Sequence, residues 1–258
     1  MRRMLLKIGG KAFSDKTAFA DLAAAILSAS AEVIIVHGGG AEISQALADA
    51  QHATVFVDGV RVTQKEDMEI IEQVLSESVN GRIAACLSEF GVDCLRLAGK
   101  SDSLFIARKM LLNGVDIGCV GEIVRVHPAI VLQALAEKKV PVVSPISADE
   151  HGVTFNVNAD TAAAALAVAA KCTDLVYFSD VPGVMDENDQ VVPFMTMKAG
   201  SYLMQKGIIA GGMVAKMESI FDAVKQGVHK VHILRWQGVN TLDYLLHDVD
   251  IIKTAIHK

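Results

Sequence analysis

Short runs of apolar residues alternate along the chain with longer stretches in which apolar residues recur every three or four positions. The short runs predict buried β-strands, and the longer stretches predict amphipathic helices. Strands are expected at residues 5–8, 33–36, 93–97, 140–144, 175–179 and 231–234. Helices are expected at residues 19–28, 41–50, 65–90, 128–138, 159–170, 198–206 and 214–225. This alternation indicates the α/β class, as a three-layer αβα sandwich with a mostly parallel central sheet.

The pattern changes near the middle of the chain. Residues 149–152 predict a turn, and an extended segment follows at 153–157, which together predict a β-hairpin arm. A second α/β run begins after this arm. We therefore expect two lobes, residues 1–150 and 151–258, that share one continuous sheet.

Composition narrows the class of protein further. A chain of 258 residues with 52% hydrophobic residues can bury a substantial core. Its longest apolar stretch, residues 162–170, is far shorter than the roughly 18 residues of a membrane span, and the apolar run after Met1 is too short for a secretory signal. The four cysteines form no C-x-x-C pair, and we interpret them as reduced core thiols. These features predict a cytoplasmic protein without a membrane partner.

The charge balance argues against a nucleic-acid partner. The formal net charge is −6, and no block of basic residues stands out. An acidic protein that binds anions must place its few cations locally, so the informative lysines and arginines are those next to glycine.

Two predicted strands end in glycine. Lys7 precedes Gly9-Gly10, and the second strand runs into His37-Gly38-Gly39-Gly40. Backbone N–H groups without obstructing side chains, together with a lysine, favour an anionic ligand such as a polyphosphate. A tight turn that lets a helix pack closely on a strand is the structural alternative for the same glycines.

Several better-known motifs are incomplete. Gly99-Lys100-Ser101 looks like the end of a P-loop, but Cys94 stands where that motif needs glycine. No G-x-S-x-G pentapeptide accompanies the glycine triplet, and no H-R-D or D-F-G segment occurs. An esterase and a protein-kinase fold are therefore excluded.

Further polar residues have two interpretations each. Arg61 is either a bidentate carboxylate clamp or a surface arginine. Asn156 and Asn158 would point the same way from an extended segment toward a polar ligand, or one of them caps the following helix. Gly211-Gly212 precedes Lys216, and Asp160 is a natural carboxylate to hold Lys7 and Lys216 together. Such a set fits phosphoryl transfer, in which positioning and fixed positive charge do most of the work.

Taken together, these segments closely resemble the acetylglutamate kinases of the amino-acid kinase fold. The matching motifs follow the family's order and cover most of the chain: Lys7-Ile8-Gly9-Gly10, Val36-His37-Gly38-Gly39-Gly40, Gly59-Val60-Arg61-Val62-Thr63, Val120-Gly121-Glu122-Ile123, Val143-Ser144-Pro145-Ile146, Asn156-Val157-Asn158-Ala159-Asp160-Thr161-Ala162, Ser179-Asp180-Val181-Pro182-Gly183-Val184 and Gly211-Gly212-Met213-Val214-Ala215-Lys216.

The resemblance implies ATP-dependent phosphorylation of the side-chain carboxylate of N-acetyl-L-glutamate in arginine biosynthesis. It implies three catalytic residues, Lys7, Lys216 and Asp160. It assigns the acyl amino acid to Gly39, Gly40, Arg61, Asn156 and Asn158, and the nucleotide to Gly9, Gly10, Gly38, Ser179, Asp180, Gly183, Gly211 and Gly212. The N-terminal lobe would bind the acyl amino acid and dimerise, and the C-terminal lobe would bind ATP.

The residue types agree with this reaction. A glutamate side chain with a pKa of about 4.3 is already an anionic nucleophile at neutral pH, so no general base is needed. Mg²⁺ would arrive with the phosphates of ATP, and no protein metal site is expected.

Two alternatives stay open. One is a kinase of a related acyl amino acid such as N-acetyl-aminoadipate, which differs by about one methylene. The other is a nucleotide-sensing regulator without turnover, although retention of both lysines and Asp160 argues against it. Because only Met1 to Arg3 precede the apolar run that begins at Met4, the resemblance also implies a homodimer that is insensitive to arginine.

Overall fold

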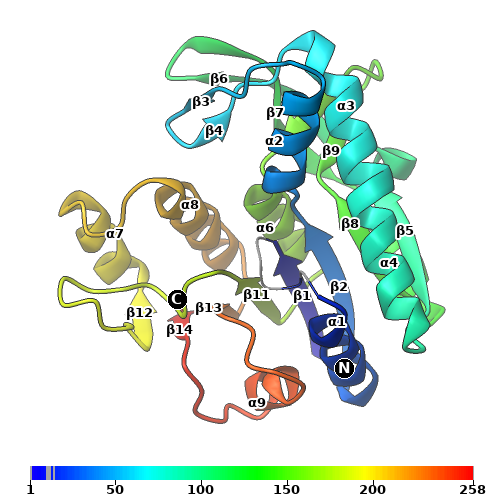
Figure 1. Cartoon of the computed structure of the whole chain (residues 1–258). Helices are drawn as coiled ribbons and strands as arrows, with labels where there is room; N and C mark the ends of the chain where they lie inside the picture. Colours follow the sequence, from blue (N-terminus) through cyan, green and yellow to red (C-terminus); the bar gives the residue numbers. More distant parts are fainter. Residues whose placement is uncertain (1, 10–12, 14, 258) are drawn as a thin grey trace.

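An eight-stranded sheet forms the centre of the computed structural model, which describes residues 2–9, 13 and 15–257 (Figure 1). Its strand order is β12-β14-β13-β11-β1-β2-β8-β5, and all neighbours are parallel except β13 and β14. The strands are β1 (Arg2–Ile8), β2 (Ala31–His37), β5 (Cys94–Ala98), β8 (Val140–Ser144), β11 (Asp174–Phe178), β12 (Phe194–Thr196), β13 (Lys230–Leu234) and β14 (Thr254–His257). The predicted α/β class with a mostly parallel sheet is confirmed.

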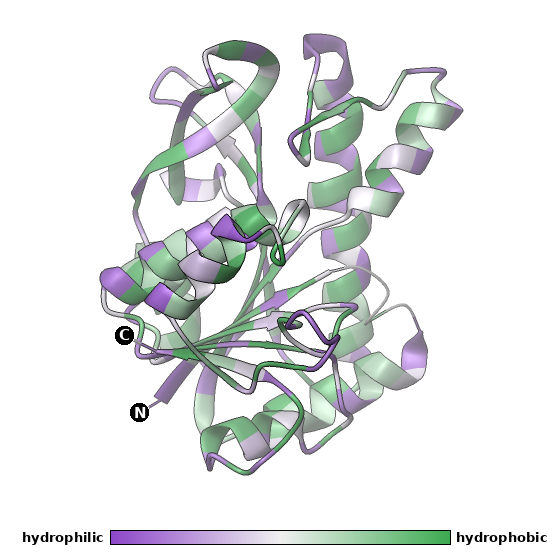
Figure 2. Cartoon of the chain, turned by 90° about the vertical axis from the view of Figure 1, so that its left-hand side faces the viewer, coloured by the Kyte–Doolittle hydropathy of each residue, from purple (hydrophilic) through white to green (hydrophobic). Residues whose placement is uncertain are grey.

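Helices cover both faces of this sheet because successive strand residues point to opposite sides. Met4 and Leu6 of β1 belong to one buried cluster with α1, whereas Leu5 belongs to a second cluster with α6. The helices carry hydrophobic and hydrophilic positions side by side around the strands (Figure 2). They include α1 (Lys16–Ser28), α2 (Gly40–Asp49), α5 (Ala129–Ala136), α6 (Ala159–Ala169), α7 (Met197–Gln205), α8 (Gly212–Lys225) and α9 (Thr241–Leu246). No helix in the described part of the chain is long and apolar enough to cross a bilayer.

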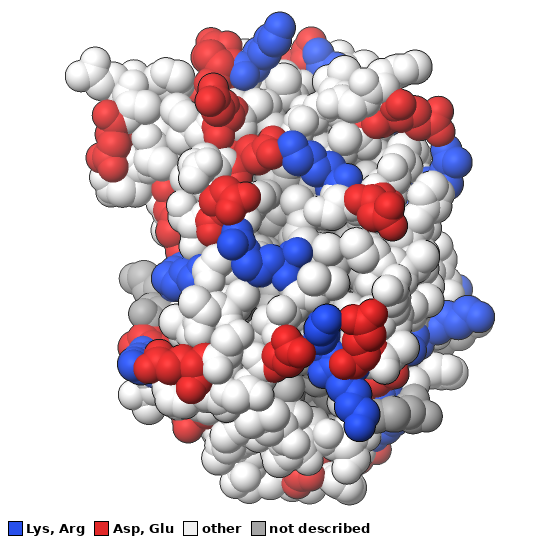
Figure 3. Space-filling model, turned by 90° about the vertical axis from the view of Figure 1, so that its right-hand side faces the viewer, with Lys and Arg blue, Asp and Glu red and all other residues white. Residues whose placement is uncertain are grey.

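The sheet contains strands from both sides of residue 150. The assignment of two lobes that meet there stays a prediction. Acidic and basic side chains are interspersed over the face shown in Figure 3, which carries no large patch of one sign.

A small closed barrel is the main feature that the sequence pattern did not predict. It consists of β6 (Phe105–Leu112), β7 (Val115–Val126), β9 (Ile146–Ala148) and β10 (Thr154–Val157). The antiparallel pair β9–β10 is the expected hairpin arm. The long β6–β7 hairpin was not expected, nor were the short strands β3 (Phe56–Val57) and β4 (Val60–Arg61), β12, β14 or α9.

The long helix expected at residues 65–90 is divided. A 3₁₀ turn (Lys65–Asp67) and α3 (Met68–Glu72) are followed by a π-helical segment, η3 (Gln73–Val79), and then α4 (Asn80–Glu89). The π segment brings Leu75 so close to the glycine turn after β2 that a Cβ on Gly39 would lie 2.8 Å from Leu75 Cδ2. Such segments are rare and often occur near functional sites.

The β3–β4 hairpin is attached to the barrel through Thr63. Its backbone N–H donates to Ile117 O at 3.1 Å, and its carbonyl accepts from Cys119 N at 2.6 Å. Between these partners lies Gly118 with φ +81°, where a Cβ would be only 2.0 Å from Thr63 O. Gly118 therefore permits the close approach that fixes the strand carrying Arg61.

We expect Gly118→Ala to lower the free energy of unfolding by about 3 kcal/mol or more, because left-handed strain is combined with a backbone overlap. Gly114→Ala is the matched control, since Gly114 also has φ +81° but nothing within 4 Å of its added Cβ. That control should lose only about 1 kcal/mol. Urea unfolding of both variants checks the expectation, and equal losses would contradict it.

Candidate active site

Two lysines share one carboxylate at the carboxyl end of the sheet. Lys7 Nζ lies 2.8 Å from Asp160 Oδ1, and Lys216 Nζ lies 2.6 Å from Asp160 Oδ2. The side chain of Lys7 is 14% exposed, that of Lys216 is 9% exposed and that of Asp160 is 15% exposed. These three residues, called the charge triad below, are therefore largely shielded from water but still accessible to a ligand. The structure thus brings together the three residues that the resemblance marked as catalytic.

Three separate elements position this charge triad. Lys7 is near the end of β1, Asp160 lies in the first turn of α6, and Lys216 lies in the second turn of α8. The start of α6 is fixed by Asn158, whose Oδ1 accepts from Asp160 N at 2.8 Å and Thr161 N at 3.3 Å. Asn158 is therefore the helix cap that the sequence left open as an alternative.

Charge balance within the triad favours an anionic ligand. Burial alone would raise the pKa of Asp160, but the two ammonium groups outweigh it and hold that pKa below its usual value. Burial lowers the pKa of Lys216, and Asp160 offsets part of this effect. With both lysines protonated, two positive charges face one negative charge, which leaves a net positive charge at the site.

The first glycine turn lies next to these charges. Gly9 is close enough that a Cβ there would be 3.1 Å from Lys7 Nζ. Gly10 lies outside the described residues. After β2, Gly38 N donates to Ile8 O at 3.1 Å, which ties the second glycine turn to the end of β1.

His37 and Asn80 hold the second glycine turn, a role that the sequence did not predict for either residue. Asn80 Nδ2 donates to His37 Nε2 at 3.1 Å, so the ring proton lies on Nδ1 and is donated to Gly38 O at 3.0 Å. Arg96 Nε donates to Asn80 Oδ1 at 3.2 Å, which fixes the orientation of the amide. Burial lowers the pKa of His37 to about 4. No spacing signal could have found Asn80, because its partner His37 lies 43 positions away in the chain.

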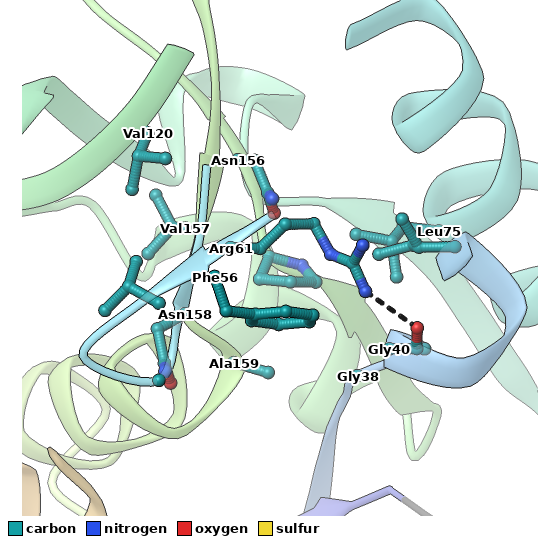
Figure 4. Close-up of a pocket in the computed structure, with 15 residues that line it drawn as sticks. Gly38, Gly40, Phe56, Arg61, Leu75, Val120, Asn156, Val157, Asn158 and Ala159 are labelled. Carbon is teal, nitrogen blue, oxygen red and sulfur yellow. Dashed lines mark hydrogen bonds between the residues drawn. The ribbon is translucent and has the colours of Figure 1, made fainter. Parts of the chain in front are cut away.

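A cavity of about 240 Å³ is lined by residues of the second glycine turn, the β3–β4 hairpin and the start of α6 (Figure 4). Its wall includes Asn158 and Ala159, which directly precede Asp160. Polar groups from Arg61 and Asn156 face apolar side chains of Ile43, Leu75 and Val120. The predicted acyl amino acid residues all line this cavity: Gly39, Gly40, Arg61, Asn156 and Asn158.

Arg61 is positioned within this cavity by several contacts. Its Nη2 donates to Gly40 O at 2.9 Å and to Ser44 Oγ at 2.8 Å, and its guanidinium lies 4.7 Å from the centre of the Phe56 ring. Asn156 Nδ2 donates to Thr63 Oγ1 at 3.0 Å. The pocket thus combines a buried cation with an amide, a set that suits a carboxylate and an acylated amine.

The other predicted nucleotide residues, Ser179, Asp180, Gly183, Gly211 and Gly212, belong to the C-terminal half of the chain. Ser179 and Asp180 directly follow β11, where Ser179 N donates to Leu234 O at 2.9 Å and Asp180 O accepts from Arg235 Nε at 3.1 Å. Gly211, with φ +57°, and Gly212 begin α8 just before Lys216. At Gly183 a Cβ would lie 2.7 Å from Thr254 Oγ1, so close packing alone already requires glycine there.

Comparison with known proteins agrees with this geometry. Residues 2–235 match the model of the amino acid kinase family. This chain belongs to that family. Its relatives include the acetylglutamate kinase of Rhodospirillum centenum, 37% identical over 246 residues that cover 90% of this chain and 81% of the relative. The acetylglutamate kinase of Pseudothermotoga lettingae is 34% identical over 236 residues, which cover 90% of this chain and 84% of the relative.

Solved structures share the architecture of this chain. A protein from Streptococcus mutans UA159 superimposes with a TM-score of 0.83 at 26% identity, covering 99% of this chain and 98% of its own. N-acetylglutamate synthase from Neisseria gonorrhoeae, complexed with coenzyme A and N-acetyl-glutamate, superimposes with a TM-score of 0.84 at 22% identity. The match covers 100% of this chain and 59% of the synthase chain. At such low identity the latter match supports the fold alone.

The depressed pKa of His37 makes folding stability depend on pH. In the unfolded chain His37 takes up a proton as the pH falls through its ordinary pKa of 6.5. In the folded protein the same ring stays neutral until the pH reaches about 4. The free energy of unfolding should therefore fall by about 3 kcal/mol from this group as the pH drops through that window.

Denaturant unfolding of the wild type and His37→Asn between pH 7 and 4 checks this expectation. The variant should lose about 3 kcal/mol less over the interval. Replacement of the exposed His151 by Asn should leave the wild-type pH dependence unchanged. Parallel pH curves for all three proteins would be evidence against a buried neutral His37.

Proposed function

We propose that this chain transfers the γ-phosphoryl group of ATP to the side-chain carboxylate of N-acetyl-L-glutamate. The product would be N-acetyl-L-glutamyl 5-phosphate, an intermediate of arginine biosynthesis. One observation carries the proposal: a pocket that presents the Arg61 guanidinium and the Asn156 amide adjoins a triad in which Lys7 and Lys216 face each other across Asp160. Relatives that are 34–37% identical over 90% of the chain and are named acetylglutamate kinase support the same reaction.

The chemical step needs charge rather than a base. A carboxylate oxygen of the substrate forms a bond to the γ-phosphorus while the bond from that phosphorus to the β–γ bridging oxygen breaks, and ADP leaves. No proton moves, because the attacking carboxylate is already ionised at neutral pH. Negative charge on the group in flight would be balanced by Lys7 and Lys216, and Asp160 would keep the two ammonium groups in place.

Binding groups surround this centre on both sides. Arg61 would clamp the α-carboxylate of the acyl amino acid, and Asn156 would hydrogen-bond its acetylated amide, with Gly39, Gly40 and Asn158 along the wall. Backbone N–H groups of Gly9 and Gly10 would bind phosphate oxygens. Gly38, whose own N–H donates to Ile8 O, would line the phosphate site without donating to it. The rest of the nucleotide would lie along Ser179, Asp180, Gly183, Gly211 and Gly212.

Mg²⁺ is the metal that such a reaction uses. Both oxygens of Asp160 are engaged by lysines, so this carboxylate is not proposed as a metal ligand. The β- and γ-phosphates would hold the ion, which retains several waters, and it would neutralise part of their charge.

Assembly and location follow as smaller proposals. The eight-stranded sheet ends at β5, and an edge strand is a surface through which two copies can pair. We propose a cytoplasmic homodimer, which sedimentation analysis of the purified protein tests.

A product assay tests the proposed function directly. The protein is incubated with ATP, Mg²⁺ and a panel containing N-acetyl-L-glutamate, N-acetyl-aminoadipate and free L-glutamate, and acyl phosphate is trapped with hydroxylamine. N-acetyl-L-glutamate should give the highest kcat/KM. A preference for N-acetyl-aminoadipate would replace the substrate, and no acyl phosphate with any acceptor would favour a nucleotide-sensing regulator.

Removal of either lysine of the charge triad should strongly reduce kcat. We expect Lys7→Ala and Lys216→Ala each to lower kcat at least about a hundredfold, because each cation is needed mainly in the transition state. Steady-state kinetics, with circular dichroism to verify folding, measures the effect. Lys225→Ala in the last turn of the same α8 helix is the matched control, and its kcat should stay near that of the wild type. Retention of more than about a tenth of kcat in both triad variants would refute the assigned roles.

Arg61→Lys should separate the two substrate sites. An ammonium group cannot reproduce the planar two-point grip on a carboxylate, so we expect the KM for the acyl amino acid to rise about tenfold or more while the KM for ATP changes little. Arg108→Lys, at an exposed arginine paired with Glu122, serves as the control. Equal increases for both substrates would remove Arg61 from the acyl amino acid site.

A further inference from the structure

A fully buried tyrosine lies beneath the charge triad. Tyr177 is 0% exposed and is paired in register with Lys7 across the parallel strands β1 and β11. Its ring therefore faces the same side of the sheet as Lys7, the side covered by α6 and α8 (Figure 1). A polar aromatic residue at this position can contact groups from both α6 and α8.

Two contacts of Tyr177 reach two members of the triad. Lys216 Nζ lies over its ring, 4.7 Å from the ring centre. Its hydroxyl donates to the backbone carbonyl of Asp160 at 3.0 Å. Burial, reinforced by the charge of Asp160, raises the pKa of Tyr177 well above its ordinary value, so the hydroxyl keeps its proton and remains a donor.

These contacts restrict where the Lys216 ammonium can point. One N–H is directed at Asp160 Oδ2, and the ring attracts the ammonium from below through the negative face of its π-system. An ammonium carries three N–H donors, so a donor remains for a ligand on the side away from the sheet. Without the ring, Lys216 would have only the carboxylate to hold it, and the ammonium could follow that carboxylate away from the ligand.

We propose that Tyr177 is a positioning residue for phosphoryl transfer, whose ring holds the Lys216 ammonium toward the ligand while its hydroxyl anchors the first turn of α6. This inference rests on the proposed function, because it assigns Lys216 to the group in flight. The ring acts through Lys216, and Tyr177 itself touches no substrate.

Two substitutions separate the ring from the hydroxyl. Tyr177→Phe keeps the ring, and we expect its kcat to stay within about threefold of the wild type. Tyr177→Leu removes the ring, and we expect kcat to fall about tenfold or more with the KM values for ATP and N-acetyl-L-glutamate changed less than threefold. Phe221→Leu in α8 is the matched control for loss of a buried ring in the same core cluster, and its kcat should stay near wild type at a similar loss of thermal stability.

The pH profile gives a readout that a purely structural role would not move. The charged or titratable groups that act on Lys216 among the described residues are Asp160 from α6, Lys7 from β1 and the tyrosine itself from β11. A ring that attracts the ammonium raises the pKa of Lys216, so its loss should shift the basic limb of the kcat profile to lower pH by about half a unit. Tyr177→Phe and Phe221→Leu should keep the wild-type limb.

A titration independent of turnover separates this inference from the proposed function. Carbon-13 resonances of the Lys216 side chain, followed by NMR in wild type and Tyr177→Leu, should titrate at lower pH in the variant. If they do, the ring contact stands even if no acyl amino acid is phosphorylated. An unchanged lysine titration, an unchanged kcat in Tyr177→Leu, or a Tyr177→Phe loss as large as that of Tyr177→Leu would overturn the positioning role.

Discussion

The arrangement of the site depends on one carboxylate shared by two ammonium groups. Asp160 binds Lys7 and Lys216 through separate oxygens, at 2.8 and 2.6 Å, and so ties β1, α6 and α8 together at a single point. Removing charges from water is costly unless they are paired. Here the pairing leaves one positive charge in excess, which an anionic ligand can neutralise. The same interaction therefore organises the fold locally and prepares the site for phosphate.

The glycine turns can approach this charge centre because neighbouring side chains leave no room for anything larger. A Cβ at Gly39 would meet Leu75 of the π segment at 2.8 Å, and one at Gly9 would lie 3.1 Å from Lys7 Nζ. His37, neutral and held by Asn80, fixes the carbonyl of Gly38. The backbone N–H groups are thus held by buried packing rather than by the ligand, which is the preorganisation that electrostatic catalysis requires.

The pattern of apolar residues predicted those strands and helices whose burial is determined by neighbouring positions in the sequence. Buried parallel strands such as β1 and β2 are apolar on both faces, so their runs were identified. The pairing of Asp160 with two lysines was expected from the residue types as well as from the family motif. The β6–β7 hairpin was missed because its strands are partly exposed and carry charges such as Arg108. Its turn, Asn113-Gly114 with both φ positive, is the sequence signal that could have found it. Contacts between distant segments, such as Asn80 with His37 or Tyr177 with Lys216, leave no local signal at all.

The central claim is that the phosphoryl group in flight lies between Lys7 and Lys216. A crystal structure of the protein with ADP, Mg²⁺, N-acetyl-L-glutamate and aluminium fluoride, a planar mimic of that group, measures this most directly. Our account predicts that the aluminium fluoride lies between Lys7 Nζ and Lys216 Nζ, with fluorine atoms within about 3 Å of both. The substrate carboxylate and the β-phosphate of ADP should lie in line on opposite sides of it. A fluoride bound away from either lysine, or a substrate carboxylate directed away from it, would contradict the account.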